Sequence, residues 1–365
     1  MIDRLRDLRN KLLADARFQH FAAAFPLTRG VAQSKSKALF DLCAGFVYSQ
    51  VLSACVELEL FRILGEGPAR LRTLSFRTGV PEAGLERLLK AAAAIDLIDR
   101  RGDVYALGEL GAALLGNPSV FAMIRHHGAL YADLEDTVGL LRARSKDTRL
   151  ARYWSYVAAS DPRELSDEDA ADYTDLMAAT QAFIAGDVIR AYPLQRHRRL
   201  LDVGGGSGVF GAHSARSAGG LEVEVCDLPP VAARAQARFA EQGLAGRATA
   251  TPLDFLREPL PQGADIVSLV RVLHDHDDAD AALILSRARD ALSAGGRLLV
   301  AEPMAGTRRA EASGDAYFGI YLWAMGAGRP RTRQTLADMI KDAGFRRVRE
   351  RRTANPMLVR VLVAD

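Results

Sequence analysis

The chain has 365 residues, 49% of them hydrophobic and 25% charged, which is the composition of a globular protein and excludes a disordered chain. This length exceeds what one ordinary hydrophobic core fills, so we expect two domains. Residues 1–40 contain eight Lys or Arg against three Asp, whereas the whole chain has a net charge of only +3. The main body is therefore slightly acidic, which argues against a nucleic-acid-binding protein.

The first segment is a basic N-terminal arm over residues 1–36. Leu5, Leu8, Leu12 and Ala16 recur at the helical period, which predicts an amphipathic helix over residues 3–24. The Phe-Pro-Leu-Thr-Arg-Gly run at 25–30 predicts a break. Such a helix suits either a partner subunit, which we favour, or an anionic membrane surface.

Residues 37–118 follow the pattern of a winged-helix unit. A long apolar helix over 40–64 precedes a Gly-Glu-Gly-Pro run, and then come a helix, a turn at 79–81, a second helix and a short hairpin near 99–107. DNA binding would need a polar face on the second helix. That helix, over 86–98, is apolar beyond its first turn. We therefore interpret this domain as an interaction module and expect no nucleic-acid partner.

Residues 119–195 are expected to form helices that link the domains and line a substrate pocket. His126 and His127 are adjacent in this segment and point to different helix faces, so they do not form a metal pair. Residues 196–365 alternate short apolar strands with helices, and they end in two strands joined near 355–356. This pattern predicts an α/β fold, with a Rossmann-like parallel sheet and a terminal antiparallel hairpin.

A glycine loop follows the first strand of this sheet and permits the close approach of an adenosine cofactor. By itself the loop is also compatible with a dinucleotide. Asp202 precedes the loop, where a carboxylate favours a cationic amino-acid group over a pyrophosphate. Asp227 and Asp254 follow the next two strands and could accept from the ribose hydroxyls and the adenine amino group. The expected set for S-adenosylmethionine is Asp202, Gly204, Gly205, Gly206, Gly208, Asp227, Leu228, Asp254, Phe255 and Arg271.

His274 lies just past a buried strand, at the edge of the sheet where ligands bind in open α/β folds. Methyl transfer to a hydroxyl requires loss of its proton, and a neutral histidine is the expected general base. A metal cluster over residues 274–278 is the alternative. Consecutive residues converge poorly on one ion, so we expect no metal.

The cysteines and the N-terminus indicate where the protein resides. Cys43, Cys55 and Cys226 are scattered without metal-site spacing, as expected for reduced thiols. The N-terminus has no uninterrupted apolar stretch, and no apolar run approaches the roughly 20 residues that span a bilayer. We expect a cytoplasmic protein, with contact to a membrane surface as an option.

Several segments resemble a known family. DVGGGSG, CDLP, LHDHDD and the final hairpin are similar to small-molecule O-methyltransferases of the caffeate and acetylserotonin type, over most of the chain. ALFDLCAGFVYSQVL, GNPSVFAMIRHHGALYADL and GDAYFGIYLWAMGAGRPRT resemble the carotenoid-pathway members in purple bacteria, which methylate the tertiary hydroxyl of demethylspheroidene or hydroxyneurosporene. The resemblance implies a homodimer formed through the winged-helix-like domain.

The resemblance also implies roles for individual residues. His274 is the base and Glu302 orients it, whereas the family's second supporting Glu is replaced here by Pro330 or a neighbouring Arg. An apolar wall suits a long hydrocarbon acceptor, although ordinary core packing would produce the same pattern. The candidates for this wall are Met177, Phe183, Tyr317, Phe318, Tyr321 and Met325.

Other functions remain open at this point. Within the methyltransferases, a small phenol or a tetrapyrrole carbon could be the acceptor in place of a hydroxylated acyclic carotenoid. A non-methylating member of the fold, a dehydrogenase and a winged-helix regulator are more remote. His274 argues against the first, Asp202 against the second and the apolar second helix against the third.

Overall fold

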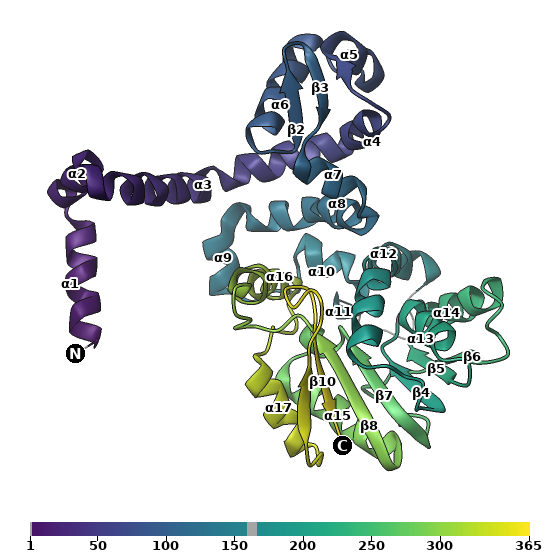
Figure 1. Cartoon of the computed structure of the whole chain (residues 1–365). Helices are drawn as coiled ribbons and strands as arrows, with labels where there is room; N and C mark the ends of the chain where they lie inside the picture. Colours follow the sequence, from purple (N-terminus) through teal and green to yellow (C-terminus); the bar gives the residue numbers. More distant parts are fainter. Residues whose placement is uncertain (1, 159–165) are drawn as a thin grey trace. The chain divides into compact units, whose positions relative to one another are not determined.

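The computed structural model describes residues 2–158 and 166–365, so residues 159–165 of the expected helical segment 119–195 lie outside it. The chain folds into two compact units, Met1–Asn117 and Pro118–Asp365 (Figure 1).

The first unit begins with three helices, α1 (Ile2–Ala14), α2 (Ala16–Ala24) and α3 (Pro26–Glu57). The single helix expected over 3–24 is therefore two, because the Asp15 side chain accepts a hydrogen bond from the Phe18 N–H and starts a new helix. The break expected at 25–30 is confined to Phe25, whose backbone is extended between α2 and α3. Pro26 occupies the first turn of α3, a position where its fixed φ angle favours a helix.

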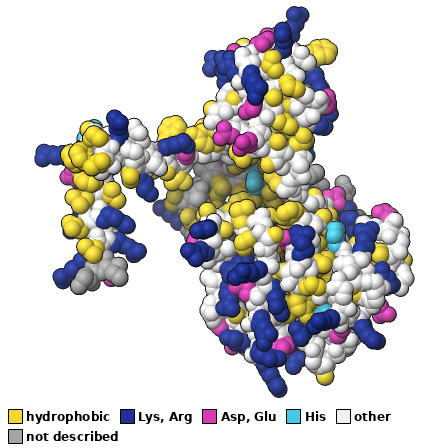
Figure 2. Space-filling view, in the orientation of Figure 1, with side chains coloured by type: hydrophobic (Ala, Val, Ile, Leu, Met, Phe, Trp, Pro, Cys, Tyr) yellow, Lys and Arg dark blue, Asp and Glu magenta, His cyan; other side chains and the backbone are white. Residues whose placement is uncertain are grey.

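These three helices carry most of the exposed large apolar side chains of the first unit. Figure 2 shows hydrophobic side chains in yellow along these helices, interspersed with dark blue Lys and Arg. The exposed large apolar side chains include Leu5, Leu8, Leu12, Leu13, Phe21, Phe25, Leu27, Val31, Leu39, Phe40, Leu42, Phe46 and Val47. By length and composition α3 could also cross a membrane, although core helices of soluble proteins meet the same criterion.

The rest of the first unit confirms the winged-helix pattern. Gly79 ends the first helix of the pair with φ +71°, a conformation that glycine adopts readily. Leu85, Leu89 and Ala92 of the second helix are buried, so its apolar face packs inside its own unit. The elements are α4 (Leu60–Gly65), β1 (Ala69–Arg70), α5 (Leu71–Thr78), α6 (Glu82–Ala94), β2 (Ile98–Arg101), β3 (Val104–Leu107) and α7 (Glu109–Leu115).

The second unit opens with helices that precede the sheet. They are α8 (Pro118–Asp133), α9 (Thr137–Arg142), α10 (Arg149–Tyr153), α11 (Ser155–Ala158) and α12 (Asp167–Ala191). Helix α8 packs on both α10 and α12. Trp154 and Tyr173 of this helical segment lie in a buried cluster that also contains Tyr321 from a later part of the chain.

A seven-stranded sheet forms the centre of the second unit, in the order β6-β5-β4-β7-β8-β10-β9. Its strands are β4 (Arg199–Val203), β5 (Glu222–Asp227), β6 (Ala248–Pro252), β7 (Ala264–Val270), β8 (Leu292–Glu302), β9 (Val348–Arg351) and β10 (Arg360–Ala364). The first five in this order are parallel, and β10 pairs antiparallel with both β8 and β9. The predicted Rossmann-like sheet with a terminal hairpin is confirmed.

Helices cover both faces of this sheet. They are α13 (Val209–Ser217), α14 (Pro229–Glu241), α15 (Asp278–Ala291), α16 (Gly319–Met325) and α17 (Arg333–Asp342). Along β4, Leu200 belongs to one buried cluster and Leu201 to another, because alternate residues of a strand point to opposite faces. The chain runs from β4 to β5 on one side and later to β7 on the other. This reversal creates a crevice at the carboxyl ends of the strands.

Candidate active site

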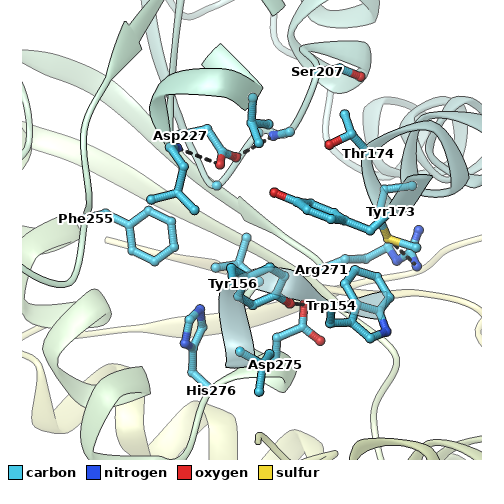
Figure 3. A pocket seen from close by; sticks show the side chains of 18 of the residues that line it. Trp154, Tyr156, Tyr173, Thr174, Ser207, Asp227, Phe255, Arg271, Asp275 and His276 are labelled. Carbon is cyan, nitrogen blue, oxygen red and sulfur yellow. Dashed lines mark hydrogen bonds between the residues drawn. The ribbon is translucent and has the colours of Figure 1, made fainter. Parts of the chain in front are cut away.

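A cavity of about 350 Å³ lies where β4, β5 and β7 end. Nine residues of the expected cofactor and substrate sets line it: Met177, Gly204, Gly205, Gly206, Asp227, Leu228, Asp254, Phe255 and Arg271. Asp202 and Gly208 are not among the lining residues. Other lining residues are Trp154, Tyr156, Tyr173 and Thr174 from the helical segment expected to line a pocket, and Asp275 and His276 from the segment weighed as a metal cluster (Figure 3).

The glycine loop forms one wall of the cavity and cannot carry side chains at two positions. A Cβ on Gly205 would lie 2.4 Å from the Oδ2 atom of Asp202. At Gly208, φ is +75° and a Cβ would lie 2.7 Å from the ring of Phe239. Because these two positions are glycines, the loop can pack closely on Asp202 and Phe239 while its backbone borders the cavity.

Asp202 is the support under this loop. Its Oδ1 atom accepts a hydrogen bond of 2.6 Å from the Ser268 hydroxyl, whereas Oδ2 has no partner among the described residues. Burial raises the pKa of this carboxyl to about 7. A buried acceptor without a donor is unfavourable, so this carboxyl fits a ligand that brings a cation or a donor to the loop.

Asp227 lies at the end of β5 and borders the cavity. Its two oxygens accept 2.8 Å hydrogen bonds from the backbone N–H groups of Gly206 and Leu228, which fixes the carboxylate (Figure 3). Burial raises its pKa to about 6, against the opposing effect of these donors. Each oxygen keeps a second lone pair, so the group can accept two more hydrogen bonds.

Asp254 and Phe255 follow β6 and border another part of the cavity. The Oδ1 atom of Asp254 accepts from the Leu256 N–H at 2.8 Å. The ring of His276 meets the ring of Phe255 edge-on, with 5.7 Å between the centroids. This aromatic pair and the acid beside it could hold a flat, amino-bearing heterocycle.

Aromatic side chains from the helices of residues 119–195, the segment expected to line a pocket, form another wall of the cavity. The Tyr156 hydroxyl donates to the Oδ2 atom of Asp275 at 3.2 Å. Tyr173 extends across the cavity in Figure 3, on the same side as Thr174. The sequence predicts pocket-lining helices in this segment, but helical spacing alone does not show which of their side chains face a cavity.

His274 stands in a short 3-10 turn, Leu273–Asp275, just beyond β7. Its Nδ1 atom lies 2.5 Å from the Oε2 atom of Glu302, which ends β8. The other oxygen of Glu302 accepts from the backbone N–H groups of Val272 (3.0 Å) and Leu273 (2.7 Å). The carboxylate is therefore held by the same turn that carries the imidazole, and it fixes the orientation of the ring.

The second ring nitrogen of His274 also faces an acid, because Nε2 lies 3.2 Å from the Oδ1 atom of Asp275. Burial alone would lower the pKa of His274. The nearby carboxylates of Asp275 and Glu302 outweigh it and raise the pKa above the ordinary value of 6.5. Hydrogen bonding at Nδ1 leaves Nε2 as the atom able to take up a proton from a ligand.

Arg271 makes the sharp bend before this turn, with φ +60° in a non-glycine residue. Its guanidinium donates to the Thr180 hydroxyl at 2.8 Å and to the Met177 sulfur at 3.4 Å. Burial lowers its pKa. The bend points the next two N–H groups at Glu302, while the side chain places a positive charge in the cavity wall.

Only some of the residues expected to form the acceptor wall lie beside His274. The ring of Phe318, in the π-helix Ala312–Phe318, lies edge-on to His274 with centroids 5.9 Å apart. Tyr321 accepts from the Trp154 indole N–H at 2.8 Å and lies 2.6 Å from the Nε2 atom of His126. Met325 is fully buried in the aromatic cluster, and Phe183 is 45% exposed and does not line the cavity.

Asp277 and Asp278, the two acids farther along the segment 274–278, are partners of arginines. Asp277 pairs with Arg144, and Asp278 pairs with Arg329 and Arg331. Over residues 2–158 and 166–365, no group of three or more His, Cys, Asp or Glu is placed to hold a metal ion.

Comparisons with known proteins agree with this geometry. Residues 131–346 match a family model described as an O-methyltransferase domain, and residues 40–117 match an O-methyltransferase dimerisation domain. The chain is 41% identical to a demethylspheroidene O-methyltransferase of Cereibacter sphaeroides, over 93% of this chain and 89% of that protein. It is 37% identical to the protein of that name from Rhodobacter capsulatus, over 97% of this chain and 88% of that protein.

A solved structure matches along nearly the whole chain as well. It is a methyltransferase of calicheamicin biosynthesis in its SAH-bound form, with a TM-score of 0.76 and 26% identity. The match covers 91% of this chain and 98% of that one.

Proposed function

Because this chain belongs to the S-adenosylmethionine-dependent O-methyltransferases with an N-terminal dimerisation domain, we propose that it methylates the tertiary hydroxyl of a hydroxylated acyclic carotenoid. The observation that carries this proposal is the similarity to two demethylspheroidene O-methyltransferases over more than nine-tenths of the chain. The dimerisation domain supports a homodimer as the working form.

The cavity residues have distinct proposed roles in holding the cofactor, which supplies an activated methyl group on sulfur. Asp227 accepts from the ribose hydroxyls with the lone pairs that its backbone bonds leave free. Asp254 accepts from the adenine amino group, and Phe255 and His276 border the ring. Asp202 stabilises the glycine loop and attracts the positively charged end of the cofactor.

His274 is the proposed general base. The bound cofactor would supply the methyl group, and as the acceptor oxygen takes it up, the hydroxyl proton would pass to the Nε2 atom of His274. Glu302 accepts the Nδ1–H bond and stabilises the imidazolium that results. The cofactor would bring the methyl group already activated, so the protein contributes mainly by placing the hydroxyl oxygen in line with it and within hydrogen-bond reach of His274.

An acceptor comparison tests the proposed substrate. Purified protein is incubated with labelled S-adenosylmethionine and either demethylspheroidene in detergent or a simple catechol. We expect label in the carotenoid and little in the catechol, because the wall near His274 offers the apolar ring of Phe318. Label in the catechol alone would keep the reaction class and discard the carotenoid.

We also propose that the N-terminal arm contacts a membrane surface, where a long hydrocarbon acceptor would reside. In α1, exposed Leu5, Leu8 and Leu12 lie among basic residues, the pattern of a helix at an anionic interface. In flotation assays the protein should rise with phosphatidylglycerol vesicles and much less with neutral phosphatidylcholine vesicles. A combined Arg4→Gln, Arg6→Gln, Arg9→Gln variant should lose this preference. If the wild type and the variant float equally with phosphatidylglycerol vesicles, the arm would instead be assigned to the partner subunit.

The raised pKa of His274 predicts a pH dependence. Only the neutral imidazole can act as a base, so kcat/KM for the acceptor should fall as the pH drops through a value above 6.5. Asp275→Asn removes one of the two carboxylates that raise this pKa, and it should move the midpoint to lower pH. An unchanged midpoint in the variant would mean that another group controls this limb.

A further inference from the structure

The turn that carries His274 is held in place by a segment far along the chain, Gly326–Thr332. The Arg329 N–H donates to the His274 carbonyl oxygen at 2.8 Å. Gly328 lies directly against this carbonyl, with φ +74°, and a Cβ there would be 2.1 Å from the oxygen. The segment therefore packs on the main chain of the proposed base, with no room for a side chain between them.

Within this segment, Arg331 donates hydrogen bonds to the main chain on both sides of His274. Its Nη1 atom donates to the carbonyl of Leu273 at 2.6 Å, and Nη2 donates to the carbonyl of His276 at 2.7 Å. Its Nε atom donates to the Oδ1 atom of Asp278 at 2.9 Å. Arg331 is only 3% exposed, so a buried charge is satisfied by two backbone carbonyls and one carboxylate.

The backbone of Arg331 is fixed independently of the turn. Its carbonyl oxygen accepts from the Ala305 N–H at 3.0 Å, three residues beyond Glu302. The next residue, Thr332, caps α17 by accepting from the Thr335 N–H at 3.1 Å. The carboxyl end of β8 therefore reaches His274 by two routes, through Glu302 to the imidazole and through Arg331 to the main chain.

We propose that Arg331 is a positioning residue for His274, which it serves by fixing the carbonyls of Leu273 and His276. This inference rests on the proposed role of His274 as the base. A planar guanidinium can donate to two diverging carbonyls and an acid at once, which a lysine ammonium cannot do with the same geometry. Without these bonds the turn can rotate, and a displacement of about 1 Å at a reacting group can cost about 100-fold in rate.

The first test measures kcat with S-adenosylmethionine and demethylspheroidene. Arg331→Lys should lower kcat about 10- to 100-fold, while the Kd for S-adenosylhomocysteine changes less than about twofold, because Arg331 does not line the cofactor cavity. In Arg331→Ala, added guanidinium should restore part of the lost kcat, and methylammonium should not. Arg333→Lys is the matched control, since Arg333 pairs with Glu350 and should keep normal kcat.

The second test is independent of turnover. In protein labelled with ¹⁵N-histidine, the Nδ1 proton shared with Glu302 gives a low-field resonance that is identified by its loss in His274→Gln. This resonance should shift or broaden in Arg331→Lys and recover with guanidinium in Arg331→Ala. Normal kcat in Arg331→Lys, or lowered kcat with an unchanged resonance and no rescue, would overturn the proposal. If His274→Ala keeps full activity, the base assignment itself fails, and the resonance still reports whether Arg331 positions the ring.

Discussion

Replacing His274 with alanine is expected to lower kcat by about 10²- to 10⁴-fold, the usual contribution of a positioned general base. The acceptor is proposed to be a tertiary alcohol, which is a much weaker acid than a phenol, so loss of the base should be costly. The Kd for S-adenosylhomocysteine should change little, because His274 is not among the residues that line the cavity. Single-turnover methyl transfer with bound cofactor measures the chemical step directly.

The matched control for this variant is His213→Ala. His213 lies on α13 of the same unit, where its Nδ1 atom contacts the Val209 carbonyl, and it is not part of the site. Its removal should leave kcat within about twofold of the wild type. A fall of less than tenfold in His274→Ala would show that proximity to the methyl group suffices and that no base acts in the transition state.

The second large effect is expected on cofactor binding when Asp227 is changed to asparagine. The carboxylate now accepts two backbone N–H bonds and has lone pairs left for two ribose hydroxyls. An amide would direct its NH₂ group at one of the backbone donors and lose the charge that strengthens the remaining bonds. Hydrogen bonds to charged groups contribute about 1.5–3 kcal/mol each, so the Kd for S-adenosylhomocysteine should rise about 100-fold or more.

Titration calorimetry measures this change, with Glu224→Gln as the control. Glu224 lies on the same strand but pairs with Arg199 and Thr251, away from the cavity, so its variant should bind the cofactor normally. The kcat of Asp227→Asn at saturating cofactor should stay close to that of the wild type. Unchanged cofactor affinity in Asp227→Asn would remove Asp227 from the proposed ribose site.

The parts of the site that could be predicted from sequence are those with local signals. A strand that ends in glycines, followed by acids at the ends of the next two strands, places Gly206, Asp227 and Asp254 at one edge before any coordinates are known. His274 and Glu302 follow the same logic, because each comes at the end of a buried strand and the two strands are neighbours in the sheet. Their direct contact is a result of this register.

Which of the other side chains face the cavity and which lie in the core depends on tertiary packing. The spacing of Tyr321 and Met325 fits a pocket wall as well as a core, and the structure places both in a buried cluster. Tyr156 and Tyr173 reach the cavity because their helices fold over the sheet edge, which no local pattern specifies. The sequence indicated Arg331 only as a neighbour of Pro330, the position where the family's second supporting Glu is replaced. Its contacts with Leu273 and His276 depend on residues more than 50 positions away.

The place of β10 in the sheet has a consequence for biosynthesis. β10 is the last strand of this sheet in chain order, yet it lies between β8 and β9 in the sheet. Its Arg360 pairs with Glu302 of β8. At 5–20 residues per second, a ribosome needs roughly 3–12 s to travel from Glu302 to Arg360. During that interval β8 has an open edge of unpaired backbone groups, which is a site for aggregation. Expression at low temperature, or with chaperones that shield nascent strands, should therefore increase the yield of folded enzyme more than it would for a sheet completed in chain order.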